Sequence, residues 1–320
     1  MPLTLEHIRW AYRLFLDREP DSDETIRPHI EVCQDTKQLR YHLFNSIEYL
    51  EKNPSTFVPA VPGNGARLEV ELDSSPESML QLFAKVESTW EGWGDVDAHW
   101  SVMSQNEFKT EELEVSRDLF EKSGKADAEI IRYTLERNGL NLDECQSCIE
   151  IGCGTGRITR WLSTIFSDVF AYDISSNHLR KAEEYLKAKE VERVSLLKFN
   201  SLNDMSKLPK TDFVFSVIVL QHNPPPVIKF MIQSILECLN PGGLALFQVP
   251  TYLKDYSFKI DSYLKTPIDS VNLEMHVIPQ CDVFKIAEEC NCSTVEVVED
   301  DCIGKPRGSV SNTFLLKKHL

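Results

Sequence analysis

The chain has 320 residues, of which 42% are hydrophobic, and a formal net charge of −16. This length allows one large domain or two modest ones, and the apolar fraction is enough for a core. The acidic balance argues against a nucleic-acid partner and against docking on anionic lipid, since both rely on clustered Lys and Arg. No run of about 18 apolar residues occurs, so no membrane span is expected. The first residues also lack the pattern of a secretory signal.

The chain contains nine cysteines. An odd number of cysteines without a secretory signal predicts reduced thiols and a cytoplasmic location. Cys145 and Cys148 are spaced as a possible pair of zinc ligands. The only candidates to complete a site are Cys290 and Cys292, whose spacing does not match a zinc ribbon, so we expect no metal.

Residues 1–53 are predicted to be helical, because apolar residues from Ile8 to Leu16 recur at three- and four-residue spacing. A second helix is expected to carry Leu39 through Leu50. The stretches YRLFLDREPD and FNSIEYLEKN resemble the small helical DUF4214-type module, with Asp17 in place of the usual Gly. That resemblance implies an association with enzymes of glycan assembly. The alternative interpretation is a dimerisation appendage, which would give a homodimer through the N-terminal helices.

Residues 54–80 are rich in Pro, Gly and Ser and are predicted to be a linker. Residues 81–140 should form helices, and the Trp-rich part from residue 90 to residue 124 should cover a ligand as a lid. From residue 141 to 320, short β-branched runs alternate with helical patterns, which favours a parallel sheet with crossover helices. Seven strands are expected, in the runs CIEIGC, DVFAYDI, VSLLKFN, DFVFSVIVL, GLALFQVP, TVEVVED and NTFLLKK. Helices of about 10–18 residues fit between the first five.

A glycine-rich loop follows the first of these strands. Gly152, Gly154 and Gly156 are preceded by Glu150, and Asp173 ends the next strand. Glycines let a backbone turn sharply and approach a ligand, and an acid about 20 residues on can bind ribose hydroxyls. The G-x-G-x-G spacing disfavours a nicotinamide oxidoreductase, whose loop has G-x-G-x-x-G. A tight turn without a ligand is the simpler alternative.

The segments EIGCGTGRIT and AYDIS are similar to the first two motifs of class I S-adenosylmethionine-dependent methyltransferases. The resemblance implies an α/β fold, a Rossmann-like seven-stranded sheet of order 3-2-1-4-5-7-6, here with a helical N-terminal extension. It places the three glycines beneath the amino-acid part of S-adenosylmethionine, Asp173 on the ribose and Ile174 on the adenine. The other cofactor-binding residues that it implies are Asn200, Ser201, Leu202, Val217, Trp100 and Gly124. Many members have an Asp at the position of Asn200.

Acceptor-binding residues are expected after the fourth and fifth strands, where ligands lie in such sheets. His222 and His276 are the candidate general bases, because imidazole titrates near neutral pH. The candidate substrate-binding residues are Gln221, Asn223, Gln248, Tyr252 and Glu274. A turn or loop role is the simpler interpretation of each histidine.

The predicted activity is O-methylation of a small molecule or glycan end by direct displacement, with a histidine as general base. A sugar acceptor is favoured because VFSVIVLQHNPPP, FQVPTY and EMHVIPQ resemble a bacterial, carbohydrate-associated subgroup of methyltransferases. An N- or C-methyltransferase acting on a small metabolite is the alternative. A non-catalytic protein that binds the cofactor is a third interpretation. A Mg²⁺-dependent reaction is disfavoured, since the fourth strand ends in Gln, His and Asn rather than acids.

Overall fold

The structure is a computed structural model that describes residues 3–44, 46–52, 65–103, 113–268, 273–303 and 308–320. The side chains of residues 31, 50, 51 and 95–118 lie outside this description. The chain divides into two compact units, residues 1–59 and residues 60–320. Each unit is described by itself.

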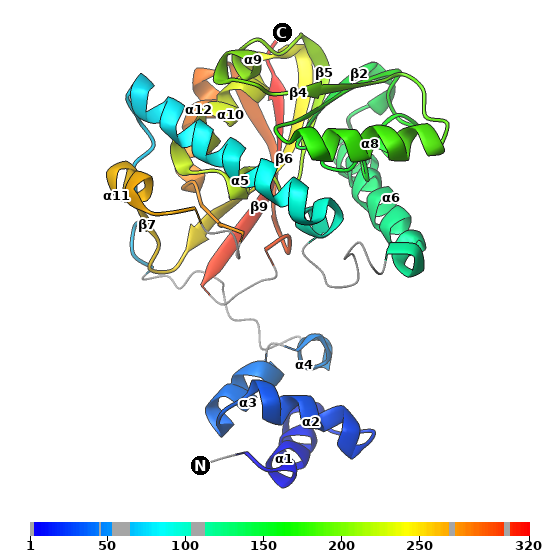
Figure 1. The fold of residues 1–320 in the computed structure, drawn as a ribbon, viewed down its shortest axis with the longest axis vertical. Helices are drawn as coiled ribbons and strands as arrows, with labels where there is room; N and C mark the ends of the chain where they lie inside the picture. Colours follow the sequence, from blue (N-terminus) through cyan, green and yellow to red (C-terminus); the bar gives the residue numbers. More distant parts are fainter. Residues whose placement is uncertain (1–2, 45, 53–64, 104–112, 269–272, 304–307) are drawn as a thin grey trace. The chain divides into compact units, whose positions relative to one another are not determined.

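The N-terminal unit consists of helices α1 (Leu5–Leu16), α2 (Asp23–Val32), α3 (Thr36–Phe44) and α4 (Ile47–Lys52) (Figure 1). Thr4 begins α1 by accepting a hydrogen bond from the backbone amide of His7. The buried stripe that the sequence predicted on α1 packs against the other helices. Within this unit, Arg18 joins the end of α1 to α4 through two hydrogen bonds to the Glu48 carboxylate, of 2.6 and 2.8 Å.

Two details of the N-terminal unit depart from or extend the sequence prediction. The single helix expected from Leu39 to Leu50 is wrong, because α3 and α4 are separate and the Ser46 hydroxyl accepts from the amide of Tyr49 at the start of α4. Asp17, which ends α1, has φ of 49°. That left-handed conformation favours glycine and also tolerates Asp.

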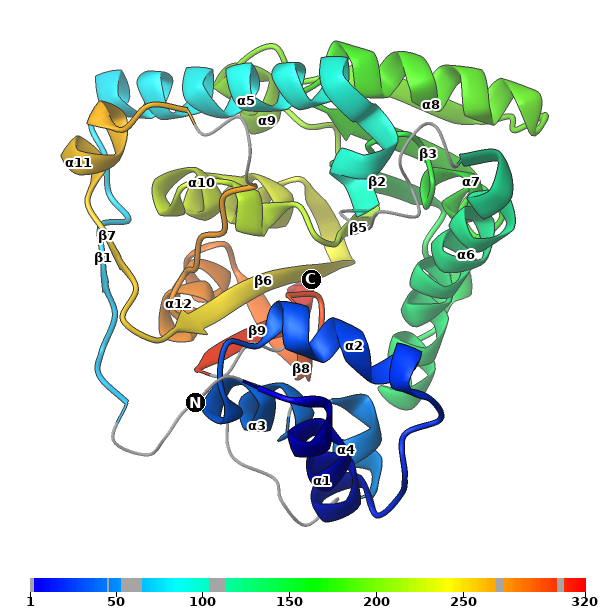
Figure 2. The ribbon, with the colours of Figure 1, turned by 60° about the horizontal axis from the view of Figure 1, so that its bottom comes forward.

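The C-terminal unit is built on a seven-stranded sheet in the order β4-β3-β2-β5-β6-β9-β8 (Figures 1 and 2). The strands are β2 (Ser147–Ile151), β3 (Asp168–Asp173), β4 (Val194–Lys198), β5 (Thr211–Ser216), β6 (Leu239–Leu253), β8 (Cys292–Asp300) and β9 (Ser309–Lys318). All neighbouring pairs are parallel except those of β9, which runs antiparallel to β6 and β8. The α/β class and the mostly parallel sheet are therefore confirmed.

Helices cover the sheet and connect its strands. They are α5 (Pro76–Met103), α6 (Leu113–Arg137), α7 (Thr159–Leu162), α8 (Ser176–Ala188), α9 (Leu202–Ser206), α10 (Pro225–Glu237), α11 (Ile260–Lys265) and α12 (Gln280–Glu289). Short 3-10 turns occupy Leu142–Glu144 and Leu220–His222. One apolar core joins α5, α9, α10 and α12 to the sheet, and a second joins α6 and α7 to it. Two layers of helices thus enclose the central strands, as apolar strands buried on both faces require.

Part of the expected linker is structured instead. Strand β1 (Glu69–Val70) pairs in parallel with β7 (Ser257–Phe258), and α5 begins at Pro76 rather than at residue 81. The Glu71 carboxylate also accepts from the amide of Ile260, at 2.8 Å. These contacts bind residues 69–71 to a segment almost 190 positions away, which composition could not indicate. The long helices expected after β2 and β4 are likewise short, with four residues in α7 and five in α9.

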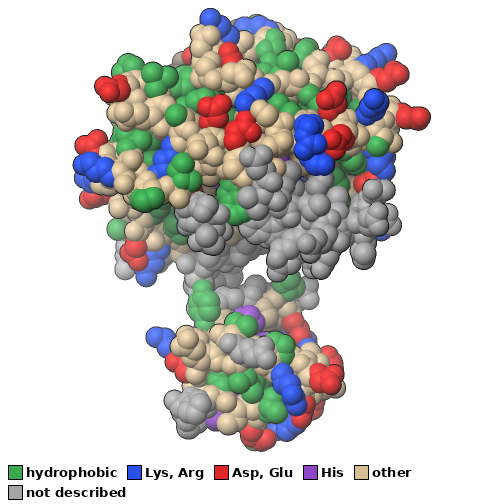
Figure 3. All heavy atoms as spheres, viewed as in Figure 1, with side chains coloured by type: hydrophobic (Ala, Val, Ile, Leu, Met, Phe, Trp, Pro, Cys, Tyr) green, Lys and Arg blue, Asp and Glu red, His purple; other side chains and the backbone are tan. Residues whose placement is uncertain are grey.

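Within the described residues, no helix combines the length and the apolar character that crossing a membrane requires. Figure 3 shows acidic and basic side chains interspersed over the visible face of the larger unit. No continuous basic patch appears among the side chains drawn in colour there.

The amino ends of the central strands are joined by one carboxylate. Asp212 accepts hydrogen bonds from the amides of Gln146 and Ser147 at 3.0 and 3.1 Å, from the Ser147 hydroxyl, and from the Asn240 amide at 2.7 Å. Partial burial opposes ionisation, but the bonds from Asn240 and from the β2 amides prevail and lower the pKa of Asp212.

We expect Asp212→Ala to lower the free energy of unfolding by about 1–3 kcal/mol at pH 7, because buried amides lose their acceptor. A lowered pKa contributes stability above the ordinary value of 3.8, which is lost as the pH falls. The difference from the wild type should therefore shrink below that pH. Urea unfolding at pH 7 and pH 3 measures it, with the exposed Asp168→Ala as control. Equal losses for both variants at pH 7 would contradict the assignment.

Candidate active site

The glycine loop turns sharply after β2. Gly152, Gly154 and Gly156 have φ of 76°, 54° and 83°, conformations that L side chains rarely adopt. The amides of Gly152 and Cys153 both donate to the Tyr172 carbonyl of β3, at 2.8 and 2.9 Å. A Cβ at position 152 would lie 2.3 Å from the Val219 side chain. The backbone therefore passes the end of β5 at a distance that only glycine allows.

Asp173 connects the loop to the next strand. Its Oδ2 accepts from the amide of Gly154 at 2.8 Å and its Oδ1 accepts from the amide of Ser175 at 2.9 Å. The side chain is only 8% exposed and lines the pocket described below. A carboxylate held in this way at the carboxyl end of a strand is oriented to accept further hydrogen bonds from ligand hydroxyls.

Glu150 is a buried carboxyl group on β2. It is 3% exposed, and the Thr159 hydroxyl donates to it at 2.6 Å. Desolvation raises the pKa of Glu150 to about 7, against the opposing hydrogen bond of Thr159 and the charge of Arg157. Since Glu150 lines the same pocket, a cation entering it would favour the ionised carboxylate.

A single pocket brings these groups together, with about 950 Å³ of empty volume that is partly open to solvent. Predicted cofactor residues line it, namely Glu150, Gly152, Gly154, Asp173, Ile174 and Val217. Trp90, the first residue of the predicted lid, also lines it, and further lining residues were not predicted from sequence: Phe83, Val86, Ile151, Cys153, Arg157, Ile158, His178, Phe199, Met205, Ile218, Val219, Val227 and Met231.

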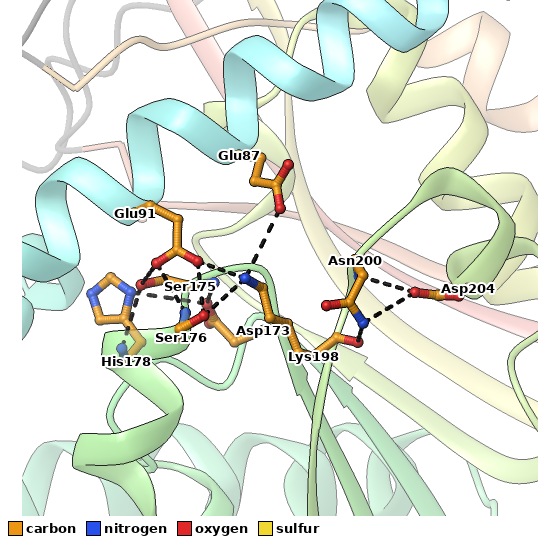
Figure 4. A network of polar contacts seen from close by, with 9 residues as sticks. All are labelled: Glu87, Glu91, Asp173, Ser175, Ser176, His178, Lys198, Asn200 and Asp204. Atoms are coloured by element: carbon orange, nitrogen blue, oxygen red, sulfur yellow. Dashed lines mark hydrogen bonds and ion pairs between the residues drawn. The ribbon is translucent and has the colours of Figure 1, made fainter.

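Helix α5 closes one side of this pocket and is attached to the sheet by charged contacts (Figure 4). Glu91 accepts from the amide and hydroxyl of Ser176 at 3.1 and 2.9 Å, and Lys198 donates to it at 2.6 Å. Glu91 thus binds the amino end of α8, where a negative charge is favourable. The TWEGW stretch signalled a lid by its tryptophans, and Trp90 of that stretch lines the pocket.

Other predicted cofactor residues do not line this pocket. Gly156 faces α8, where a Cβ would approach Ala182 at 3.3 Å. Gly124 lies against the Arg157 carbonyl, and a Cβ there would be 2.4 Å from its oxygen. Both glycines therefore allow close packing around the loop. Trp100 belongs to α5, but its side chain lies outside the described part.

The segment Asn200-Ser201-Leu202 is adjacent to the pocket without lining it. The backbone amide of Asn200 donates to the Asp204 carboxylate at 2.9 Å. The Ser201 hydroxyl begins α9 by accepting from the backbone amide of Asp204. The pocket wall here is made by Phe199 and Met205, on either side of the predicted segment. The structure thus gives Asn200 a local partner in place of a ligand contact.

Gln221 and Asn223 follow β5 as expected, whereas Gln248 and Tyr252 lie within β6 rather than after it. Ile218 has φ of 60°, which is strained for a β-branched residue, and its amide donates to Gln248 at 2.9 Å. Gln248 donates to Gln221 at 3.0 Å, and Asn223 lines the pocket while donating to the Val219 carbonyl. Tyr252 is half-buried on β6 and pairs with Val310, away from the pocket lining.

Two residues that line the pocket are close to His222. One is its chain neighbour Asn223, and the other is Trp90, whose ring centroid is 5.4 Å from that of His222. Its Nδ1 is 2.8 Å from the Glu274 carbonyl oxygen, which can only accept, so Nδ1 carries the hydrogen. In the neutral ring Nε2 then accepts a hydrogen bond from the Gln221 side-chain amide, at 3.3 Å. Desolvation lowers the pKa of His222 to about 4, against the hydrogen bond to Glu274.

His276 has partners at both ring nitrogens. Nδ1 is 2.8 Å from the Tyr256 hydroxyl, and Nε2 is 3.2 Å from the Glu274 carboxylate. The side chain is buried, and neither His276 nor His222 lines the pocket. Of the two candidate bases the geometry favours His222, because its ring lies 5.4 Å from that of Trp90, which lines the pocket.

The pocket fits the predicted sulfonium nucleoside in its polar groups. Carboxyl groups at Glu150 and Asp173 suit an ammonium group and ribose hydroxyls, and apolar side chains such as Ile174 suit a base. The Thr155 hydroxyl and Arg157 Nε are also buried without a hydrogen-bond partner among the described residues. Such orphaned groups in a binding loop are consistent with a ligand that would satisfy them.

Comparisons with known proteins agree with this geometry. Residues 149–245 match the family model described as a methyltransferase domain. No sequence among the curated proteins matches the chain.

Several solved structures resemble this chain. A magnesium protoporphyrin IX methyltransferase from Synechocystis PCC 6803 with bound SAH is 15% identical over 73% of this chain and 99% of its own, with a TM-score of 0.49. A methyltransferase from Clostridium acetobutylicum is 14% identical over 60% and 91%, with a TM-score of 0.45. A third, from Galdieria sulphuraria, is described as a sarcosine dimethylglycine methyltransferase and is 15% identical over 60% and 84%, with a TM-score of 0.45.

The family match spans the glycine loop, Asp173 and the strands that carry the pocket. This chain therefore contains a methyltransferase domain.

Proposed function

We propose that this enzyme methylates a hydroxyl group, with His222 as general base, and that the acceptor is a sugar or glycan end. The observation that carries the proposal is the bond between His222 Nδ1 and the Glu274 carbonyl, because it makes Nε2 the ring nitrogen that can accept a proton. The ring of Trp90 and the adjacent Asn223, which both line the pocket, support a role for His222 near it.

The residues around the pocket would hold the donor. The glycine loop and Arg157 would face its amino-acid end, Asp173 its ribose and Ile174 its adenine. Glu150 would balance the positive charge of the bound donor. When bound, the donor supplies a methyl group already activated on a sulfonium, so the protein mainly aligns the acceptor and excludes water.

His222 would receive the proton of the acceptor hydroxyl. As the oxygen lone pair forms the new O–C bond and the C–S bond breaks towards sulfur, the hydroxyl proton becomes strongly acidic. A base with a pKa of about 4 can accept such a proton and remains unprotonated at neutral pH. The products are a methyl ether, the demethylated donor and an imidazolium, which returns its proton to solvent.

The polar side chains near His222 support a sugar acceptor. Asn223 lines the pocket, and its side-chain amide is a group that can pair with acceptor hydroxyls. Gln221 supports the site by donating to His222 Nε2. The Trp90 ring offers a face on which the apolar side of a sugar can stack. The DUF4214-type resemblance of the N-terminal unit points to the same substrate class.

We expect His222→Asn to lower kcat by about 10²–10⁴-fold, because the amide can still donate to Glu274 but cannot act as a base. Transfer of radiolabelled methyl groups to a panel of sugar, phenol and amine acceptors measures turnover, with SAH affinity as the control. Wild-type kcat should stay level near neutral pH and fall only as the pH approaches about 4. Full turnover by the variant would refute the base, and transfer to amines alone would refute the acceptor class.

The raised pKa of Glu150 predicts a pH-dependent affinity. SAH carries an ammonium group, so its binding should strengthen as the pH rises through about 7 and the carboxylate ionises. Glu150→Gln keeps an acceptor for Thr159 but no charge, and should bind more weakly at pH 8 with little pH dependence. Calorimetry with SAH between pH 6 and pH 8 measures both proteins.

Without ligand, the same substitution should have the opposite effect on stability. A carboxyl group whose folded pKa is raised from 4.5 to about 7 loses stability as the pH rises through that interval. Glu150→Gln should therefore have a less pH-dependent Tm than the wild type between pH 5 and pH 8. Parallel Tm profiles would show that Glu150 ionises normally.

A further inference from the structure

Residues 274–276 lie outside any helix or strand, yet they contact the 3-10 turn of His222 at two points. The Glu274 carbonyl accepts from His222 Nδ1 at 2.8 Å, and the His276 amide donates to the Gln221 carbonyl at 2.7 Å. In the first bond the His222 side chain donates to the 274–276 segment, and in the second the backbone of that segment donates to the turn. Together they fix both the position and the rotation of the His222 ring relative to the Glu274 carbonyl.

The conformation of this segment is set by the His276 side chain. Its ring is 6% exposed and is surrounded by Tyr256, Phe258 and Tyr263, with centroids 5.4 to 6.2 Å away. A neutral imidazole satisfies both of its polar partners. Nε2–H donates to the Glu274 carboxylate, and Nδ1 accepts from the Tyr256 hydroxyl.

The Glu274 carboxylate is a shared acceptor in the same cluster. It receives the Tyr263 hydroxyl at 2.5 Å as well as His276, and the His276 bond is the main cause of its lowered pKa. Lys85 of α5 donates to the Tyr263 and Thr266 carbonyls at 3.0 and 2.8 Å and lies 3.9 Å from the Tyr263 ring centroid. The cluster is thereby attached to the helix that closes the pocket.

We propose that His276 and the Glu274 carboxylate are positioning residues that hold His222 in its Nδ1–H tautomer. The inference rests on the proposed role of His222 as base. Neutral histidine in water prefers the other tautomer, which puts the hydrogen on Nε2, the nitrogen that must accept the proton. The hydrogen bond made by one ring nitrogen decides which nitrogen is protonated, so an immobile Glu274 carbonyl selects the productive form.

Nitrogen NMR of the full-length protein labelled with ¹⁵N-histidine tests this directly. The His222 signals are identified by their loss in His222→Asn, and wild-type His222 should carry its hydrogen on Nδ1. His276→Phe preserves the ring packing but removes both hydrogen bonds, and should shift His222 towards the Nε2–H tautomer. His276→Gln can donate to Glu274 and accept from Tyr256, and should restore the wild-type signature. SAH affinity should be unchanged in both variants.

The proposal is overturned if wild-type His222 carries hydrogen on Nε2, if His276→Phe leaves its tautomer unchanged, or if His276→Gln shifts it as much as His276→Phe. Tyr256→Phe removes the hydrogen bond to His276 Nδ1, together with the bond between the Val277 backbone and the Tyr256 hydroxyl, but keeps the bond from His276 to Glu274. It should cause a smaller shift in the same direction. Tyr256→Phe takes the place of His276→Phe in the test if His276→Phe does not fold. An unchanged His222 tautomer in Tyr256→Phe would also overturn the proposal.

The measurement needs no acceptor, so its outcome is separate from that of the proposed function. If His222→Asn keeps full turnover while the tautomer responds to His276, the base assignment fails and the positioning contact stands. If His222→Asn loses turnover while the tautomer ignores His276, the base stands and the positioning inference fails.

Discussion

The bond between the Asp173 carboxylate and the Gly154 amide is the constraint on which the site depends. It joins the end of β3 to a loop whose glycines occupy conformations unfavourable for other residues. With the loop held open, Glu150, Asp173 and Ile174 face one pocket. If the loop relaxed, the close approach of Gly152 to Val219 would be lost, and with it the junction between β2 and β5. Ligands of open parallel sheets bind at such a junction.

The same pocket contains a charge that the folded protein accommodates poorly by itself. Glu150 has little contact with water, and its raised pKa reflects the cost of ionising it there. A cationic ligand removes that cost, because opposite charges interact strongly in a poorly hydrated site. Residues that destabilise the free protein in this way are common at functional sites. The positive φ of Ile218, at the end of β5, is a second local strain beside the same pocket.

Acid–base chemistry and cofactor binding are separated within the fold. The glycine loop and Asp173 belong to the first half of the sheet, whereas His222 follows β5 and is held by residues beyond β6. Helix α5 contacts both parts of the fold. Its Glu91 pairs with Lys198 of β4 near Asp173, and its Lys85 donates to the Tyr263 carbonyl. Movement of α5 would therefore affect both parts, which gives the helix a role beyond covering the pocket.

The sequence alone determined the features that depend on nearby residues. Alternating β-branched runs marked the seven strands, and the spacing of Gly152, Gly154 and Asp173 indicated the cofactor, because a turn and the strand after it are encoded locally. Tertiary structure decided what depends on distant contacts. The pairing of β1 with β7, the wall made by Phe83, Val86 and Trp90, and the different surroundings of His222 and His276 all join segments far apart in the chain. Two histidines in polar loops look alike in sequence, since only packing determines which partners their ring nitrogens have and which nitrogen carries the hydrogen.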